Sequence, residues 1–78
     1  MRKRHVFRTR LDRWLVAHKV KPARLALESG YSRQHLLRIR KGEMEPTRSC
    51  IAAIVRAARK LSREPVKASE LFDLGEDA

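Results

Sequence analysis

The chain has 78 residues, of which 42% are hydrophobic, and a formal net charge of +10. This length fits one small domain, and the apolar share is too high for a disordered tail. The longest apolar run, residues 51–55, is far shorter than the ~20 residues of a membrane span, and no signal-peptide core follows the basic N-terminus. Cys50 is the only cysteine, so no internal disulfide forms and we expect a cytoplasmic protein.

Positive charge is concentrated in the first part of the chain. Residues 1–67 carry all 19 Lys and Arg with 5 acids, whereas residues 68–78 carry 4 acids and no base. This asymmetry predicts a polyanionic partner, either nucleic acid or an anionic membrane. Three regions are expected: a basic arm over 1–8, a domain over 9–74 and a short acidic tail over 75–78.

Helix signals recur along the chain, and no β-alternation of useful length appears. Thr9, Ser32 and Thr47 suit N-cap positions, with Asp12 as a short capping-box partner for the first, and Pro22 suits the first turn of another helix. The predicted ranges are about 9–18, 22–29 and 32–41, then a helix that begins at 47 with an apolar stripe ending at 61, and a short helix near 68–73. The expected core residues are Leu11, Trp14, Leu15, Leu25, Ala26, Leu36, Ile39, Cys50, Ile51, Ile54, Val55, Ala58, Leu61, Leu71 and Phe72.

The connection between the second and third helices is very short. Gly30 is suited to the left-handed position that ends a helix, and Gly42 is suited to the same position after the third helix. Only Gly30 and Tyr31 separate the two helices, which is too short for an antiparallel hairpin and suits a helix-turn-helix unit. Five short helices with tight connections predict an all-α fold.

A spaced pattern of residues runs without gaps from position 20 to position 47. Its members are Val20, Leu25-Ala26, Gly30-Tyr31-Ser32, Leu36, Ile39, Gly42 and Pro46-Thr47. The pattern resembles the Cro/C1-type (XRE-like) helix-turn-helix DNA-binding domain of phage repressors and bacterial transcriptional regulators. The flanking helices match in order and length, so the likeness covers nearly the whole chain. The resemblance implies a five-helix lambda-repressor-like domain whose third helix enters the DNA major groove.

The resemblance places base reading on the third helix, at Ser32, Arg33, Gln34 and Arg38. The chemistry of these side chains agrees, because Arg can donate two bonds to guanine and Gln can pair with adenine. An ordinary solvated helix face is the alternative. Contacts to the DNA backbone are expected from His35, Arg40, Lys41, Thr47 and Arg48, and from Arg2, Lys3 and Arg4 of the arm.

Several of these backbone contacts have an equal alternative. His35 suits solvent or base reading as well as it suits a phosphate contact. Thr47 can be a helix cap without contacting DNA, and the arm can be disordered. Two positions also depart from the family pattern. Pro22 stands where a phosphate-binding Gln is usual, and Arg40 and Leu15 stand where a Glu–Arg pair is usual. We therefore expect Arg40 to have no folding partner and to tolerate replacement by Gln.

Enzyme and metal functions are not predicted, nor is any cofactor. His5, His18, His35 and Cys50 lack metal-ligand spacing, and no catalytic constellation is visible. The sequence predicts a sequence-specific binder of double-stranded DNA, a transcriptional regulator acting as a repressor. Many proteins of the family that the sequence resembles bind as homodimers on two half-sites; this sequence shows no clear dimer surface, and the fifth helix with the residues after it is the candidate contact. The alternatives are an antitoxin-type module that binds a toxin through its acidic end and regulates its own gene, and a non-specific nucleic-acid binder.

Overall fold

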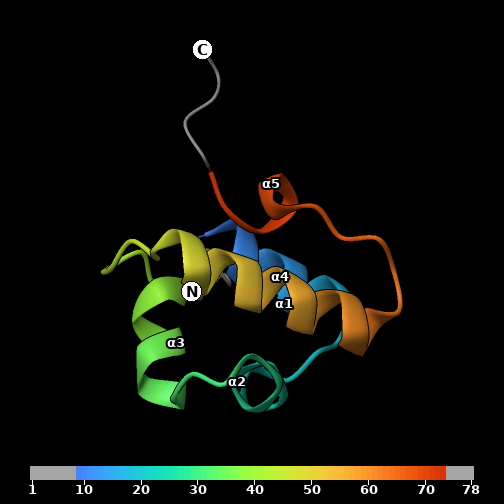
Figure 1. Cartoon of the computed structure of the whole chain (residues 1–78), viewed down its shortest axis with the longest axis horizontal. Coiled ribbons are helices and arrows are strands. Elements are labelled where there is room, and N and C mark those ends of the chain that lie inside the picture. Colours follow the sequence, from blue (N-terminus) through green and yellow to red (C-terminus); the bar gives the residue numbers. More distant parts are fainter. Residues whose placement is uncertain (1–8, 74–78) are drawn as a thin grey trace, which may run out of the picture.

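The computed structural model describes residues 9–73 and arranges them as five α-helices (Figure 1). They are α1 (Arg10–Ala17), α2 (Pro22–Ser29), α3 (Arg33–Arg40), α4 (Arg48–Ser62) and α5 (Ala68–Leu71). The span 9–73 contains no strand. The all-α prediction and the order of the helices are confirmed, while the predicted basic arm and acidic tail lie outside the described residues.

Side-chain caps begin three of the helices, as the sequence predicts. Thr9, Ser32 and Thr47 occupy the N-cap positions of α1, α3 and α4. Each side-chain oxygen accepts a hydrogen bond from the backbone N–H three residues on, at 3.0 to 3.2 Å. Each cap therefore satisfies an N–H group that has no partner inside its helix, which is worth about 1 kcal/mol in stability.

The turn between α2 and α3 depends on a glycine. Gly30 ends α2 with φ 87°, a left-handed conformation that side chains disfavour, and its N–H donates to the carbonyl of Ala26. Tyr31 and Ser32 complete the connection before α3 begins. In Figure 1, α2 is seen end-on whereas α3 runs up the page, so the two helices cross steeply.

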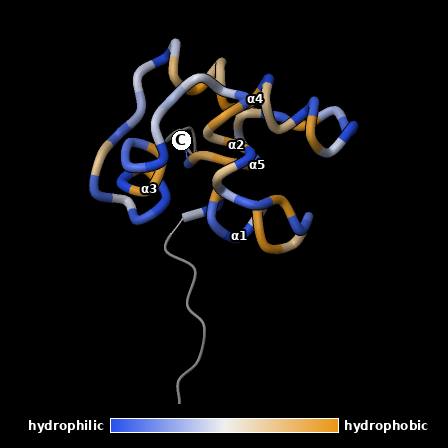
Figure 2. Tube along the Cα trace, turned by 90° about the horizontal axis from the view of Figure 1, so that it is seen from below, coloured by the Kyte–Doolittle hydropathy of each residue, from blue (hydrophilic) through white to orange (hydrophobic). Residues whose placement is uncertain are grey.

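One core joins the five helices. α2 packs against α3 and α4, and α5 packs against α1 and α4. In Figure 2 the orange, apolar stretches of the chain gather between the helices. The buried residues are Leu11, Trp14, Leu15, Leu25, Ala26, Leu36, Ile39, Cys50, Ile54, Val55, Ala57, Ala58, Val66, Leu71 and Phe72. The predicted core is confirmed except that Ile51 and Leu61 are only partly buried, and Ala57 and Val66 join it.

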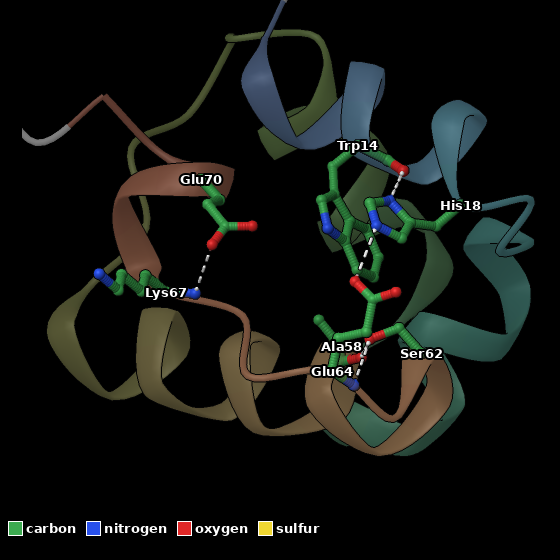
Figure 3. Close-up of polar contacts among 7 residues, drawn as sticks. All are labelled: Trp14, His18, Ala58, Ser62, Glu64, Lys67 and Glu70. Carbon is green, nitrogen blue, oxygen red and sulfur yellow. Dashed lines mark hydrogen bonds and ion pairs between the residues drawn. The ribbon is translucent and has the colours of Figure 1, made fainter.

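A histidine connects the end of α1 to the segment between α4 and α5 (Figure 3). The His18 ring stacks on Trp14 with their centroids 4.4 Å apart, and its Nδ1 lies 3.1 Å from the Trp14 carbonyl oxygen. Its Nε2 lies 3.3 Å from a carboxylate oxygen of Glu64, whose backbone N–H donates to Ser62. These contacts attach the chain after α4 to α1, on the side of the core where the Trp14 ring is buried.

The structure corrects the expectation for Arg40, which has a partner in α1. Arg40 donates from Nε and Nη2 to one carboxylate oxygen of Asp12, at 3.1 and 2.9 Å. Thr9 reinforces the contact by donating its hydroxyl to the Arg40 carbonyl at 2.9 Å. The resemblance implied that position 15 would face Arg40, but Leu15 is buried in the core and Asp12 lies one turn earlier on α1. The Asp12 carboxylate is thus used to hold α3 and not for the predicted capping box.

Neutralising either member of the pair should destabilise the fold. Both side chains are largely shielded, with 25% of Arg40 and 16% of Asp12 exposed. We expect Arg40→Gln and Asp12→Asn each to cost about 1–2 kcal/mol, the range for hydrogen bonds to charged groups with partial solvent screening. Chemical denaturation of both single variants and the double variant measures the coupling. Additive losses would mean that the pair contributes nothing to stability.

Candidate nucleic-acid interface

The third helix has one buried side and one exposed side. Leu36 and Ile39 are buried against the core, whereas Arg33, Gln34 and Arg38 are exposed. Gln34 and Arg38 are four residues apart, and Arg33 stands at the first position of the helix, so the three side chains share its outer side. The structure therefore brings together three of the four predicted base-reading residues. The fourth, Ser32, is exposed at the N-cap directly before them.

The exposed side chains of α3 are not used in holding the fold together. The side chains of Arg33, Gln34 and Arg38 make no hydrogen bond or ion pair with any other residue of the described span 9–73. Ser32 differs, because its hydroxyl oxygen accepts the His35 N–H at 3.0 Å and only its proton remains to be donated. Two guanidinium groups and one amide are thus free to bind an external acceptor or donor.

A cleft of about 480 Å³ separates the start of α2 from α3. Its lining residues are Lys21, Pro22, Ala23, Arg33, Gln34, Leu36, Leu37 and Arg40. Lys21, the exposed N-cap of α2, was not predicted as a site residue. The only signal in the sequence was its position before Pro22, where a lysine and the free N–H groups of a helix start can bind the same phosphate. Lys21 lies directly before Pro22, where the resemblance implies a phosphate-binding Gln, and its ammonium group can donate the hydrogen bonds that Pro22 cannot.

The predicted backbone-contact residues occupy different environments. Arg48 is exposed at the first position of α4, and Lys41 is exposed with its Nζ 4.0 Å from a Glu43 oxygen. Thr47 accepts the Cys50 N–H as the cap of α4. Arg40 is held by Asp12. Arg2, Lys3 and Arg4 lie outside the described residues, so their predicted contacts stay predictions.

His35 is directed toward the protein and is only half exposed. Its ring stacks on Tyr31 with centroids 4.9 Å apart, and its Nε2 lies 3.9 Å from the Cys50 sulfur. Tyr31 itself is partly buried and packs against the core. These three residues connect the turn before α3 to the first turn of α4. His35 therefore positions the start of α3, and its predicted contact with DNA would require only the exposed edge of its ring.

Cys50 belongs to the core and not to a reactive site. Its side chain is 2% exposed, and burial raises the pKa of its thiol, while a hydrogen bond with Tyr31 offsets part of the rise. A raised pKa leaves less thiolate at neutral pH, and thiolate is the reactive form. The interpretation of Cys50 as a small helix residue packed against the core is confirmed.

Comparison with known proteins gives no relative: no family model, no curated protein and no solved structure matches the chain. Within residues 9–73, no three His, Cys, Asp or Glu side chains are placed to hold a metal ion. In the same span, every helix is too short or too polar to cross a bilayer. The candidate interface is therefore defined by its own geometry and charge.

The environment of Cys50 predicts slow thiol chemistry in the folded protein. At neutral pH the native chain should react with an aromatic disulfide reagent at least about tenfold more slowly than the chain unfolded in guanidinium chloride, because burial and a raised pKa both reduce accessible thiolate. Absorbance of the released thiol follows the reaction. Equal rates in both states would mean that α4 opens readily at its first turn.

Proposed function

We propose that this protein is a Cro/C1-type helix-turn-helix regulator that binds double-stranded DNA in a sequence-specific manner and represses transcription in the cytoplasm. In this proposal α2 and α3 form the helix-turn-helix unit of a lambda-repressor-like domain. α3 is the recognition helix in the major groove. The protein binds as a homodimer on two half-sites, so that each α3 reads one of them.

One observation carries the proposal. α3 is fixed at both ends, by the Ser32 cap and by the contacts of Arg40 with α1, yet the polar side chains on its outer side have no partner within residues 9–73. A rigid helix with free, forked hydrogen-bonding groups is what reading of base edges requires. The exposed charges of a merely solvated helix are commonly paired with acids along the helix, and α3 contains no acid.

In the proposed mechanism α3 reads the bases, and residues around it contact the phosphates. Arg33 and Arg38 donate to guanine, and Gln34 pairs with adenine. Lys21, Lys41 and Arg48 contact phosphates on either side of the groove, which fixes the position of the protein without reading sequence. Occupation of a promoter in this way excludes the transcription machinery.

Selection of bound sites from random duplex DNA tests the proposal directly. We expect one preferred site, bound at least about a thousandfold more tightly than unrelated duplex DNA, the lower range for specific DNA-binding proteins. Competition with RNA of similar length, at the same salt concentration, distinguishes DNA binding from general attraction of a basic protein to polyanions. Recovery of no preferred sequence would reject the proposal.

Replacement of single arginines on α3 tests the assignment of base readers. Arg33→Ala and Arg38→Ala should each cost about 1–3 kcal/mol at the preferred site and relax specificity at one base position. Arg13→Ala on α1 is a control, because Arg13 is also an exposed helical arginine. Fluorescence anisotropy with the preferred site and its single-base variants gives these energies. A loss that is equal for every sequence would identify the arginine as a phosphate contact.

Deletion of residues 2–5 tests the proposed role of the arm. These residues include Arg2, Lys3 and Arg4, and each phosphate they neutralise contributes about 0.9 to the slope of log affinity against log salt. The truncated protein should therefore lose roughly 1–3 units of slope, if one to three arm charges engage DNA, while its melting temperature stays nearly the same. An unchanged slope in a salt series would exclude the arm from the interface.

A further inference from the structure

A second cationic surface lies on the C-terminal half of α4. It consists of Arg56, Arg59, Lys60 and the C-cap residue Arg63, which we call the α4 cationic face. All four residues are exposed, and the 15 residues of α4 include no acid. α4 crosses the front of the molecule in Figure 1 and lies at the upper edge in Figure 2, with no other helix covering it on that side. The face is therefore open to a partner.

The arrangement of these charges is unfavourable for the isolated protein. Arg56 lies three and four residues before Arg59 and Lys60, and both of these lie three or four residues before Arg63. Like charges at these spacings repel on a helix, and the negative end of the helix dipole compensates only in the last turn. An anionic partner would remove the repulsion, so the face is better matched to a complex than to solvent.

Two of the four cations are free to engage such a partner. Arg59 donates from Nε to the Val66 carbonyl at 2.8 Å, and the Lys60 Nζ lies 3.3 Å from a Glu28 oxygen. The side chains of Arg56 and Arg63 make no hydrogen bond or ion pair with any residue between 9 and 73. Arg56 and Arg63 are therefore the residues whose charge is available without breaking a contact in the fold.

We infer that the α4 cationic face binds the phosphate backbone of a second DNA duplex, so that one protein molecule bridges two duplex segments. The proposed reading surface is at the other end of α4, where Arg48 begins the helix. Arg56 and Arg63 lie about 12 and about 22 Å from Arg48 along the helix, at 1.5 Å per residue. A duplex held by α3 therefore leaves the α4 cationic face to another segment. Only this assignment of the first duplex to α3 rests on the proposed function.

The composition of the face favours a phosphate backbone over a membrane surface. A helix that lies in a membrane interface needs large apolar side chains beside its cations. The exposed large apolar residues in the described part of the chain are Val16 and Leu27, which belong to α1 and α2. The α4 cationic face instead offers arginines, whose guanidinium groups match phosphate oxygens. Because it offers no amide or other base-reading side chain, we expect contact without sequence preference.

The test compares two double variants that remove the same charge. Arg56→Gln with Arg63→Gln alters the α4 cationic face, and Arg13→Gln with Lys19→Gln is the matched control. Arg13 matches Arg56 as an exposed helical arginine, and Lys19, φ 56°, matches Arg63, φ 61°, in its left-handed backbone. In Figure 2, α1 lies on the side of the molecule opposite α4. Thermal melting of each variant verifies folding. Arg56→Gln removes the repulsion of Arg56 with Arg59 and with Lys60, so it should not lower the melting midpoint.

Bridging is measured by energy transfer between donor-labelled and acceptor-labelled short duplexes, and single binding by anisotropy of one duplex. The unaltered protein should give energy transfer. The variant of the α4 cationic face should reduce the transfer at least about fivefold while changing single-duplex affinity less than about twofold. The control variant should leave both the transfer and the affinity unchanged. No transfer with the unaltered protein, or equal transfer with both variants, would overturn the inference. Displacement of the second duplex by anionic lipid vesicles, but not by unlabelled duplex, would also overturn it. Failure of the proposed function would look different, as single-duplex binding without sequence preference.

Discussion

The contact of Arg40 with Asp12 and Thr9 fixes the orientation of α3 relative to α1. An eight-residue helix is too short to be stable by itself, so its direction depends on what holds it. Leu36 and Ile39 bury its inner side, but two apolar side chains leave the helix able to tilt about their line of contact. The two bonds from the Arg40 guanidinium and the bond from Thr9 fix its last turn to the first turn of α1. The Ser32 cap and the Gly30 turn fix the other end.

Most of the fold could be predicted because its signals are local. A cap at Thr9 or Thr47 acts on an N–H three residues away, and Gly30 acts through its own backbone angle. The Arg40–Asp12 pair could not be found in this way, because 28 residues separate its members. A single sequence contains no signal for such a pair, and the pattern that the sequence resembles has the partner of position 40 at position 15, which is Leu15 here. Ile51 was misjudged for a related reason: helical periodicity gives the side of a helix but not where its neighbours end.

The candidate interface was predictable in its outline and not in its details. Exposure of Arg33, Gln34 and Arg38 follows from the positions of the apolar residues on α3, which the sequence contains. The inward stacking of His35 on Tyr31 does not follow, because imidazole is suited to solvent, phosphate and aromatic rings alike. Lys21 was not predicted as a site residue because it lines a cleft between two helices, and a single sequence does not show that cleft. Residues with one chemical role were thus predicted better than residues with several.

Some cationic side chains of this protein are paired with acids of the fold, and others are not. Four of the acids in the described span face a cationic group or a histidine of the fold: Asp12 with Arg40, Glu28 with Lys60, Glu43 with Lys41, and Glu64 with His18. The unpaired arginines of α3 and α4 are left on the outer sides of these helices. Adding acids beside them would stabilise both helices through attraction at helical spacing, yet α3 and α4 contain none. Arginines whose side chains have no partner in the described span therefore lie on two separate surfaces, which supports the proposal that anionic partners bind there.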